Sequence, residues 1–271
     1  MKIPRLISSL CAAALLTTNA IAGGDDHLGQ AMLGQTISFT LTGVASWDSV
    51  NLGGSFGSET ATRIDLSVNY KNSLNQTVTV ANVPVFCTDL YQPVGFATYT
   101  DYTVIAATVG AFPLSGSNSR VDVSRLLALQ YLFGTAFGTA SNYFNTVSTT
   151  WPSYQLAGFQ TALWEIVHDD YRNNFGNYDF SLNTGMIQPP TTTDPAVMFA
   201  SDLLSSVRAN IAAGQGPKVD LVVLSSVNNQ DLIMAYTPVP EPSTYAFAGA
   251  ASLLGLAAYR RRKAAKAKQA A

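Results

Sequence analysis

The sequence predicts an α+β fold, namely a β-sandwich or barrel with a small helical insert, followed by a single transmembrane helix near the C-terminus. Three observations predict this. Segments in which apolar and polar residues alternate come first, segments with apolar residues at helical spacing follow, and alternating segments return before residue 238. A run of 17 residues without a charge, 243–259, then stands before a basic tail.

The predicted strands are recognised by side chains that alternate between two faces. The alternation is clearest in residues 35–44, where Ile37, Phe39 and Leu41 share one face and Ser and Thr residues occupy the other. The other segments that predict strands are 64–68, 78–80, 84–87, 98–106, 221–224 and 232–236. Residues 225–230 suit a turn that joins the last two strands into a hairpin.

Three segments in the middle of the chain predict helices, because their apolar residues recur every three or four positions. They are 121–133, 151–169 and 194–213. Pro152 suits the first turn of the second helix, Asp194-Pro195 opens the third, and Gly214 suits its end. These helices form the insert between the early and the late strands.

The N-terminus has the order of a secretory signal peptide, predicted to be residues 1–22. Lys2 and Arg5 precede the apolar run 6–16, and Ala20-Ile21-Ala22 supplies a cleavage site of small residues. The mature domain is then residues 23–238, and we expect it outside the cytoplasm. Cys11 is discarded with the signal.

The charge of the mature domain excludes one class of partner. Residues 23–238 contain seven basic and sixteen acidic residues. Nucleic-acid binding depends on clustered Lys and Arg, so we expect no nucleic-acid partner. The chain has no Gly-x-Ser-x-Gly elbow, no phosphate-binding loop and no Cys-x-x-Cys spacing. We therefore expect no cofactor, no metal site and no turnover enzyme.

The C-terminus, 239–271, combines three ordered features. Pro240-Glu241-Pro242 lies in the motif 239–242, the predicted transmembrane helix 243–259 follows, and Arg260-Arg261-Arg262 opens the basic tail 260–271. The basic tail should stay cytoplasmic. Taken alone, this is a single-pass anchor. The order resembles the PEP-CTERM sorting signal of exported bacterial proteins. The resemblance implies an exosortase-type enzyme that removes the tag, a transient stage in the inner membrane, and a final location at the cell surface or outside the cell.

Two residues of the mature domain are unusual for their surroundings. Cys87 is its single cysteine, and it predicts a buried thiol, an intermolecular disulfide or a reactive group. Gln160 lies inside the apolar stripe of the second helix, between Leu163 and Trp164 on the helical wheel. A buried amide is costly without partners, so Gln160 is either hydrogen-bonded to a backbone carbonyl or used chemically.

Cysteine and glutamine side chains can react with each other. If Cys87 and Gln160 are held together, the sulfur can replace the ammonia of the carboxamide and form a thioester, which an apolar site must then protect from water. Phe86, Phe159 and Trp164 are candidates for that protection. His168 is a candidate base for acyl transfer, or a histidine at the end of the helix that interacts favourably with the helix dipole.

The motifs around these residues resemble a known family. Phe86-Cys87-Thr88-Asp89 followed by Gln160-Thr161-Ala162-Leu163-Trp164 is similar to the bacterial thioester domains of surface adhesins, which pair a strand cysteine with a Thr-Gln-x-Ala helix motif. Phe159 stands here where that motif has Thr. The resemblance implies a Cys87–Gln160 thioester that captures an amine or hydroxyl on a surface or matrix protein or polysaccharide. Each molecule would react once, as a covalent binder.

Two non-covalent alternatives remain open from sequence. The chain is a structural protein of the extracellular matrix in which Cys87 is simply buried, or a carbohydrate-binding β-sandwich. The second alternative requires an aromatic stacking surface, for which the candidates are Tyr91, Tyr99, Tyr102 and Trp151.

Overall fold

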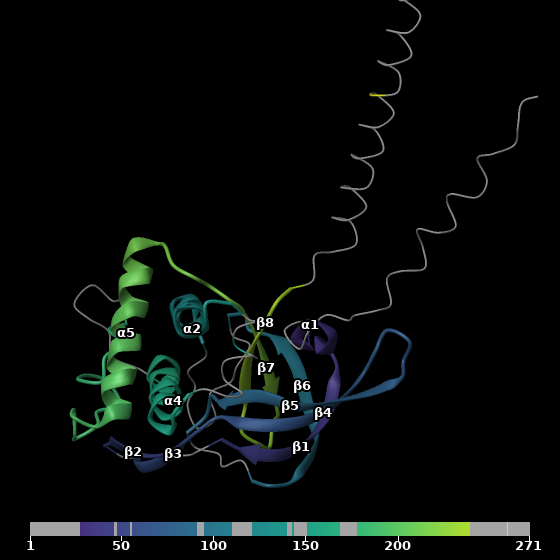
Figure 1. The fold of residues 1–271 in the computed structure, drawn as a ribbon, viewed down its shortest axis with the longest axis horizontal. Coiled ribbons are helices and arrows are strands. Elements are labelled where there is room, and N and C mark those ends of the chain that lie inside the picture. The colour runs from purple at the N-terminus through teal and green to yellow at the C-terminus, as the bar shows by residue number, and fades with distance from the viewer. Residues whose placement is uncertain are drawn as a thin grey trace, which may run out of the picture. The chain divides into compact units, whose positions relative to one another are not determined.

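The computed structural model describes residues 28–45, 48–54, 56–90, 95–109, 121–139, 143, 151–168, 178–238 and 259 (Figure 1). The chain divides into two compact units, residues 1–237 and 238–271. The described residues do not include the predicted signal peptide, the sorting motif or the basic tail. Of the predicted transmembrane helix they include only Tyr259. Within the described residues, no helix is both long and apolar enough to cross a membrane.

Six antiparallel strands of the first unit close into a barrel (Figure 1). Around the barrel they are β1 (Thr36–Val44), β4 (Ile64–Lys71), β5 (Thr77–Cys87), β8 (Leu232–Tyr236), β7 (Asp220–Ser225) and β6 (Thr98–Ala106). The ring closes because β1 pairs with β4 on one side and with β6 on the other. The prediction of a barrel with a helical insert is confirmed, and the sandwich alternative is not adopted.

The alternation of apolar residues explains the barrel interior. Ile37, Phe39 and Leu41 of β1 are buried, and in the register Leu41 faces Leu66 of β4 while Phe39 faces Val68. β7 and β8 are buried almost throughout, and helix α1 (Leu28–Met32) packs against β8.

The helices form a layer beside the barrel. α2 (Val123–Phe137), α4 (Ser153–His168) and α5 (Pro195–Ala213) pack on one another on one side of the barrel (Figure 1). Gly158 permits the close approach of α4 to α5, since a β-carbon there would lie 2.6 Å from the carbonyl oxygen of Ala196. α5 begins at the predicted Asp194-Pro195 and ends at Gly214 in the left-handed conformation, with φ 62°.

Three short elements were not predicted from the sequence. They are α1 and the two strands of a separate hairpin, β2 (Asp48–Gly53) and β3 (Gly57–Ala61). The hairpin packs on α4 (Figure 1). It is short and polar, and only Val50, Leu52 and Ala61 in it are buried, so it shows little hydrophobic pattern.

Candidate functional site

Cys87 lies at the end of β5, where the sheet is incomplete on one side. β5 pairs with β8 at Phe86 and Cys87, but its pairing with β4 stops at Val85, opposite Ile64. The chain before Ile64 leaves the barrel toward β3. On the β4 side, the backbone of Cys87 therefore has no strand to pair with.

The side-chain amide of Gln160 takes the place of that strand. Its Oε1 accepts a hydrogen bond from the backbone N–H of Cys87 at 3.0 Å, and its Nε2 donates to the carbonyl oxygen of Cys87 at 2.7 Å. The two bonds satisfy a fully buried amide and bring the carboxamide beside the residue that carries the thiol. The structure thus brings together the two residues singled out in the sequence.

The two residues after Cys87 are held in the same manner. His168 at the end of α4 places its Nε2 3.1 Å from the carbonyl oxygen of Thr88, and Gln230 donates its Nε2 to the carbonyl oxygen of Asp89. The backbone N–H of Thr88 donates to the carbonyl oxygen of Asp231 at 3.0 Å. Side chains from α4 and from the turn before β8 therefore fix the backbone of three successive residues.

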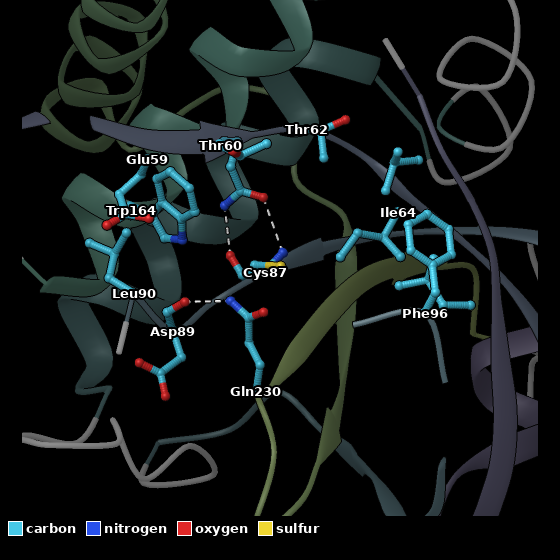
Figure 2. A pocket seen from close by; sticks show the side chains of 13 residues that line it. Glu59, Thr60, Thr62, Ile64, Cys87, Asp89, Leu90, Phe96, Trp164 and Gln230 are labelled. Atoms are coloured by element: carbon cyan, nitrogen blue, oxygen red, sulfur yellow. Dashed lines mark hydrogen bonds between the residues drawn. The ribbon is translucent and has the colours of Figure 1, made fainter. Parts of the chain in front are cut away.

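A cavity of about 390 Å³ opens at this end of the barrel (Figure 2). Its walls come from the end of β1, the start of β4 and the end of β5, represented by Leu41, Ile64 and Cys87. Gln160 and Trp164 of α4 also line it. Cavities of this size at the end of a barrel are typical sites for small molecules or side chains.

Five polar residues that line the cavity were not among the predicted site residues, and three of the five carry a carboxylate or an amide. Glu59 comes from β3, Asp89 follows β5, and Gln230 precedes β8 (Figure 2). Asp89 was visible as part of the motif around Cys87, whereas Glu59 and Gln230 lie in segments without a hydrophobic signature. The hairpin that packs on α4 brings Glu59 to the cavity, and the barrel turn before β8 brings Gln230 there.

The aromatic residues predicted to shield the site have two different positions. Phe86 and Phe159 are fully buried behind it, with their ring centroids 4.6 Å apart. They belong to an aromatic cluster between β5 and the helices that includes Phe133 and Phe137. Trp164 instead lines the cavity itself, with 3% of its surface exposed. Its Nε1 has no hydrogen-bond partner among the residues that the structure describes.

The ionisable side chains that line the cavity are mainly carboxylic acids. Glu59 and Asp89 line it, and no Lys, Arg or His is among its described lining residues. Burial raises the pKa of Glu59. Burial, and to a lesser extent the carboxylate of Asp89, raise the pKa of the Cys87 thiol well above its usual value. A free Cys87 is therefore a thiol and not a thiolate at neutral pH.

The surroundings of His168 favour its uncharged form at neutral pH. Burial lowers its pKa from 6.5 to about 4, although the hydrogen bond to Thr88 and the charge of Asp89 act in the opposite direction. His168 lies in the last turn of α4, as expected for a helix-end histidine, but at neutral pH its interaction with the helix dipole is that of an uncharged ring. His168 is absent from the residues that line the cavity, and it contacts the site through the backbone of Thr88.

We expect Asp231 and His168 to change the free energy of unfolding with pH in opposite directions. His168 binds a proton near pH 6.5 in the unfolded chain but only near pH 4 in the folded protein. Protonation therefore favours the unfolded chain, and the free energy of unfolding decreases as the pH falls from 6.5 to 4. Burial raises the pKa of Asp231 from 3.8 to about 6. The folded protein therefore holds this proton more tightly than the unfolded chain, and this stabilisation is lost as the pH rises from 3.8 to about 6. Asp231→Asn should therefore make the free energy of unfolding rise with pH more steeply between pH 4 and 6, by up to about 3 kcal/mol in total.

Urea unfolding of both proteins at several pH values measures this difference. The variant keeps an oxygen that can accept the hydrogen bond from the N–H of Ser226, so the local structure is retained. Parallel curves for the two proteins would contradict the prediction.

Two of the aromatic residues proposed for carbohydrate stacking, Tyr102 and Trp151, pack in different parts of the described structure. Tyr102 is fully buried inside the barrel, where its ring centroid lies 4.6 Å from that of Phe39 and its hydroxyl donates to the carbonyl oxygen of Gln230. Trp151 stacks on Phe137 of the helical layer. Tyr91 lies outside the described residues. Tyr99 is half-buried, and its ring centroid lies 5.8 Å from that of Tyr102. Tyr102 and Trp151 therefore do not share an exposed face with each other.

Comparison with known proteins identifies the C-terminal segment. Residues 238–263 match the PEP-CTERM protein-sorting motif. The prediction of this signal is confirmed, and the chain is an exported protein that carries an exosortase signal directing it through the membrane to the cell surface. The signal also implies processing by an exosortase-type enzyme. Neither the curated proteins nor the solved structures give a match to the chain.

Proposed function

We propose that Cys87 and Gln160 form an internal thioester, with which the exported protein attaches itself covalently to a nucleophile on a surface or matrix partner. One observation carries the proposal. Both polar atoms of the Gln160 carboxamide are hydrogen-bonded to the backbone of Cys87, at the wall of a cavity that Cys87 and Gln160 both line. Two groups that are unreactive in water gain a large rate advantage when they are held in this way.

The hydrogen bonds also suit the reaction that forms the thioester. The sulfur of Cys87 attacks Cδ of Gln160, the C–N bond breaks, and ammonia leaves with the proton of the thiol. Charge develops on Oε1 during the attack, and the N–H of Cys87 already lies 3.0 Å from that atom. The leaving nitrogen is held by the carbonyl oxygen of Cys87 at 2.7 Å.

The surroundings of Cys87 favour a long-lived thioester. A thiol is a poorer leaving group when its pKa is high, and burial together with Asp89 raises the pKa of Cys87. The buried rings of Phe86 and Phe159 close the site from behind. Attack by water or by a partner is therefore restricted to the side of the cavity.

The arrangement favours an amine over a hydroxyl as the captured group. When an amine attacks the thioester, its nitrogen bonds to Cδ, the C–S bond breaks, and its proton passes to the sulfur. The new amide retains one N–H, which can again donate to the carbonyl oxygen of Cys87, whereas an ester has no hydrogen to donate. The carboxylates of Glu59 and Asp89 also favour a cationic amine in the cavity.

The sorting signal fits this function. We place residues 243–259 in the inner membrane as a transient span, with the basic tail 260–271 in the cytoplasm and the mature domain 23–238 outside. Cleavage by the exosortase-type enzyme would then leave the domain at the cell surface or in the extracellular matrix. At either location a single covalent capture resists removal, so no catalytic turnover is required.

Intact mass spectrometry tests the thioester directly. We expect freshly purified full chain to be lighter by one ammonia than its amino-acid sequence requires. Cys87→Ala is the matched control, because cysteine and alanine residues differ by one sulfur atom and any processing of the termini cancels in the comparison. Wild-type protein that is heavier than Cys87→Ala by a whole sulfur atom contains no thioester.

That last result would favour the second candidate, a non-covalent surface or matrix protein. The observation on its side is that the backbone of Cys87 alone satisfies both polar atoms of the buried amide. A buried thiol with a raised pKa is also unreactive in ordinary proteins.

A further inference from the structure

We infer that the indole N–H of Trp164 is a catalytic hydrogen-bond donor to the carbonyl oxygen of Gln160 at the moment when that oxygen becomes charged. This role deepens the proposed thioester chemistry and rests on it. In this role Trp164 lowers the barrier of the reaction through its N–H, in addition to any shielding of the site from water by its ring.

The first observation is a buried donor without a partner. The Nε1 atom of Trp164 is inaccessible to solvent and makes no hydrogen bond to any residue that the structure describes. Burying an N–H without an acceptor costs about 1–3 kcal/mol, and buried tryptophans usually avoid this cost. A site that keeps such a donor is suited to an acceptor that is present only during a reaction.

The second observation is the position of this donor. Gln160 and Trp164 lie four residues apart on α4, so their side chains are neighbours on one face of the helix, and both line the cavity. Figure 2 shows the nitrogen of the Trp164 ring on the side that faces Cys87. The other side-chain nitrogens that line the cavity, on Gln160 and Gln230, already donate to backbone carbonyls.

The reaction supplies the missing acceptor. In both the formation and the opening of the thioester, Cδ of Gln160 becomes tetrahedral and its oxygen takes on negative charge. The N–H of Cys87 donates to one side of that oxygen, which leaves lone pairs for a second donor. Two converging donors are the usual construction of an oxyanion-binding site, and the gain is largest in a site closed to water.

Trp164→Phe tests the role, because phenylalanine keeps a buried aromatic ring and removes the N–H. The full-length wild-type and variant proteins are treated with methylamine, and thioester opening is followed by mass. We expect opening of the Trp164→Phe thioester to be slower by at least about tenfold, since loss of one such donor slows acyl transfer by up to about a thousandfold. Trp164→His restores an N–H and should recover part of the rate. Trp151→Phe is the matched control, because Trp151 stacks on Phe137 and is not among the cavity residues.

Each outcome decides the question. An unchanged or faster rate in Trp164→Phe overturns the inference and leaves the ring as a shield. Equal slowing in the Phe and His variants overturns it as well, because packing would then explain the loss. A folded Trp164→Phe that never forms the thioester supports it if Trp164→His and Trp151→Phe both form the bond, and overturns it if Trp164→His also fails. If Trp164→Phe does not fold, Trp164→His decides alone, by a rate near that of the wild type or far below it. A wild-type chain without a thioester overturns the proposed function and this inference together, and the intact mass identifies that case first.

Discussion

Cys87 of the fresh, folded chain is expected to resist thiol reagents and to become reactive after treatment with methylamine. In the thioester the sulfur is bonded to Gln160, and methylamine releases it while leaving an N-methyl amide. Because Cys87 lines the cavity, a small reagent such as methyl methanethiosulfonate can reach the released thiol. Burial raises the pKa of that thiol, so labelling will be slow, and its extent after hours is the quantity to compare.

Two variants separate this behaviour from that of an ordinary buried cysteine. Cys87→Ala should take up no methylamine, and Gln160→Ala should label at Cys87 without any amine treatment. A wild-type Cys87 that labels only after unfolding, and does so equally with and without methylamine, would contradict the thioester.

Removal of the Gln160 amide should strongly destabilise the domain, whether or not the thioester forms. The measurement uses Cys87→Ala as the parent, so that no covalent bond contributes. In that background Gln160→Ala leaves the N–H and the carbonyl oxygen of residue 87 without partners and opens a space in a fully buried site. We expect the free energy of unfolding to fall by about 4–6 kcal/mol.

A second substitution divides this loss into its parts. Gln160→Met in the same background keeps most of the side-chain volume and removes both hydrogen bonds, so it should lose about 2–4 kcal/mol. Urea unfolding of the three proteins gives the values. A Gln160→Met variant as stable as its parent would show that the amide does not act as a replacement for a strand.

Much of the fold could be predicted because its elements have strong periodic patterns. The alternation in 35–44 and the helical spacing in 151–169 reappear as β1 and α4 with nearly the same bounds. Alternation does not reveal which strands pair, so it could not decide between a sandwich and a barrel. The closure follows from the pairing of β1 with both β4 and β6.

The site was predictable only where a residue conflicted with its surroundings. Gln160 stood out as an amide in an apolar stripe, and Cys87 as a single cysteine in an exported domain. The acceptor of the Gln160 amide could not be predicted, because it depends on β4 starting at Ile64 and leaving the backbone of Cys87 unpaired. Glu59 lies in a short polar strand, and nothing in its own segment indicated that the fold brings it to the cavity.

The pairing of a side chain with a strand also affects how local opening of this protein is observed. Amide hydrogens in a barrel usually exchange with solvent when the sheet opens, because their acceptors are on neighbouring strands. The amide hydrogen of Cys87 has its acceptor on a helix instead. Its exchange rate therefore reports whether α4 remains docked on the barrel, so this one hydrogen distinguishes detachment of the helical layer from unfolding of the strands.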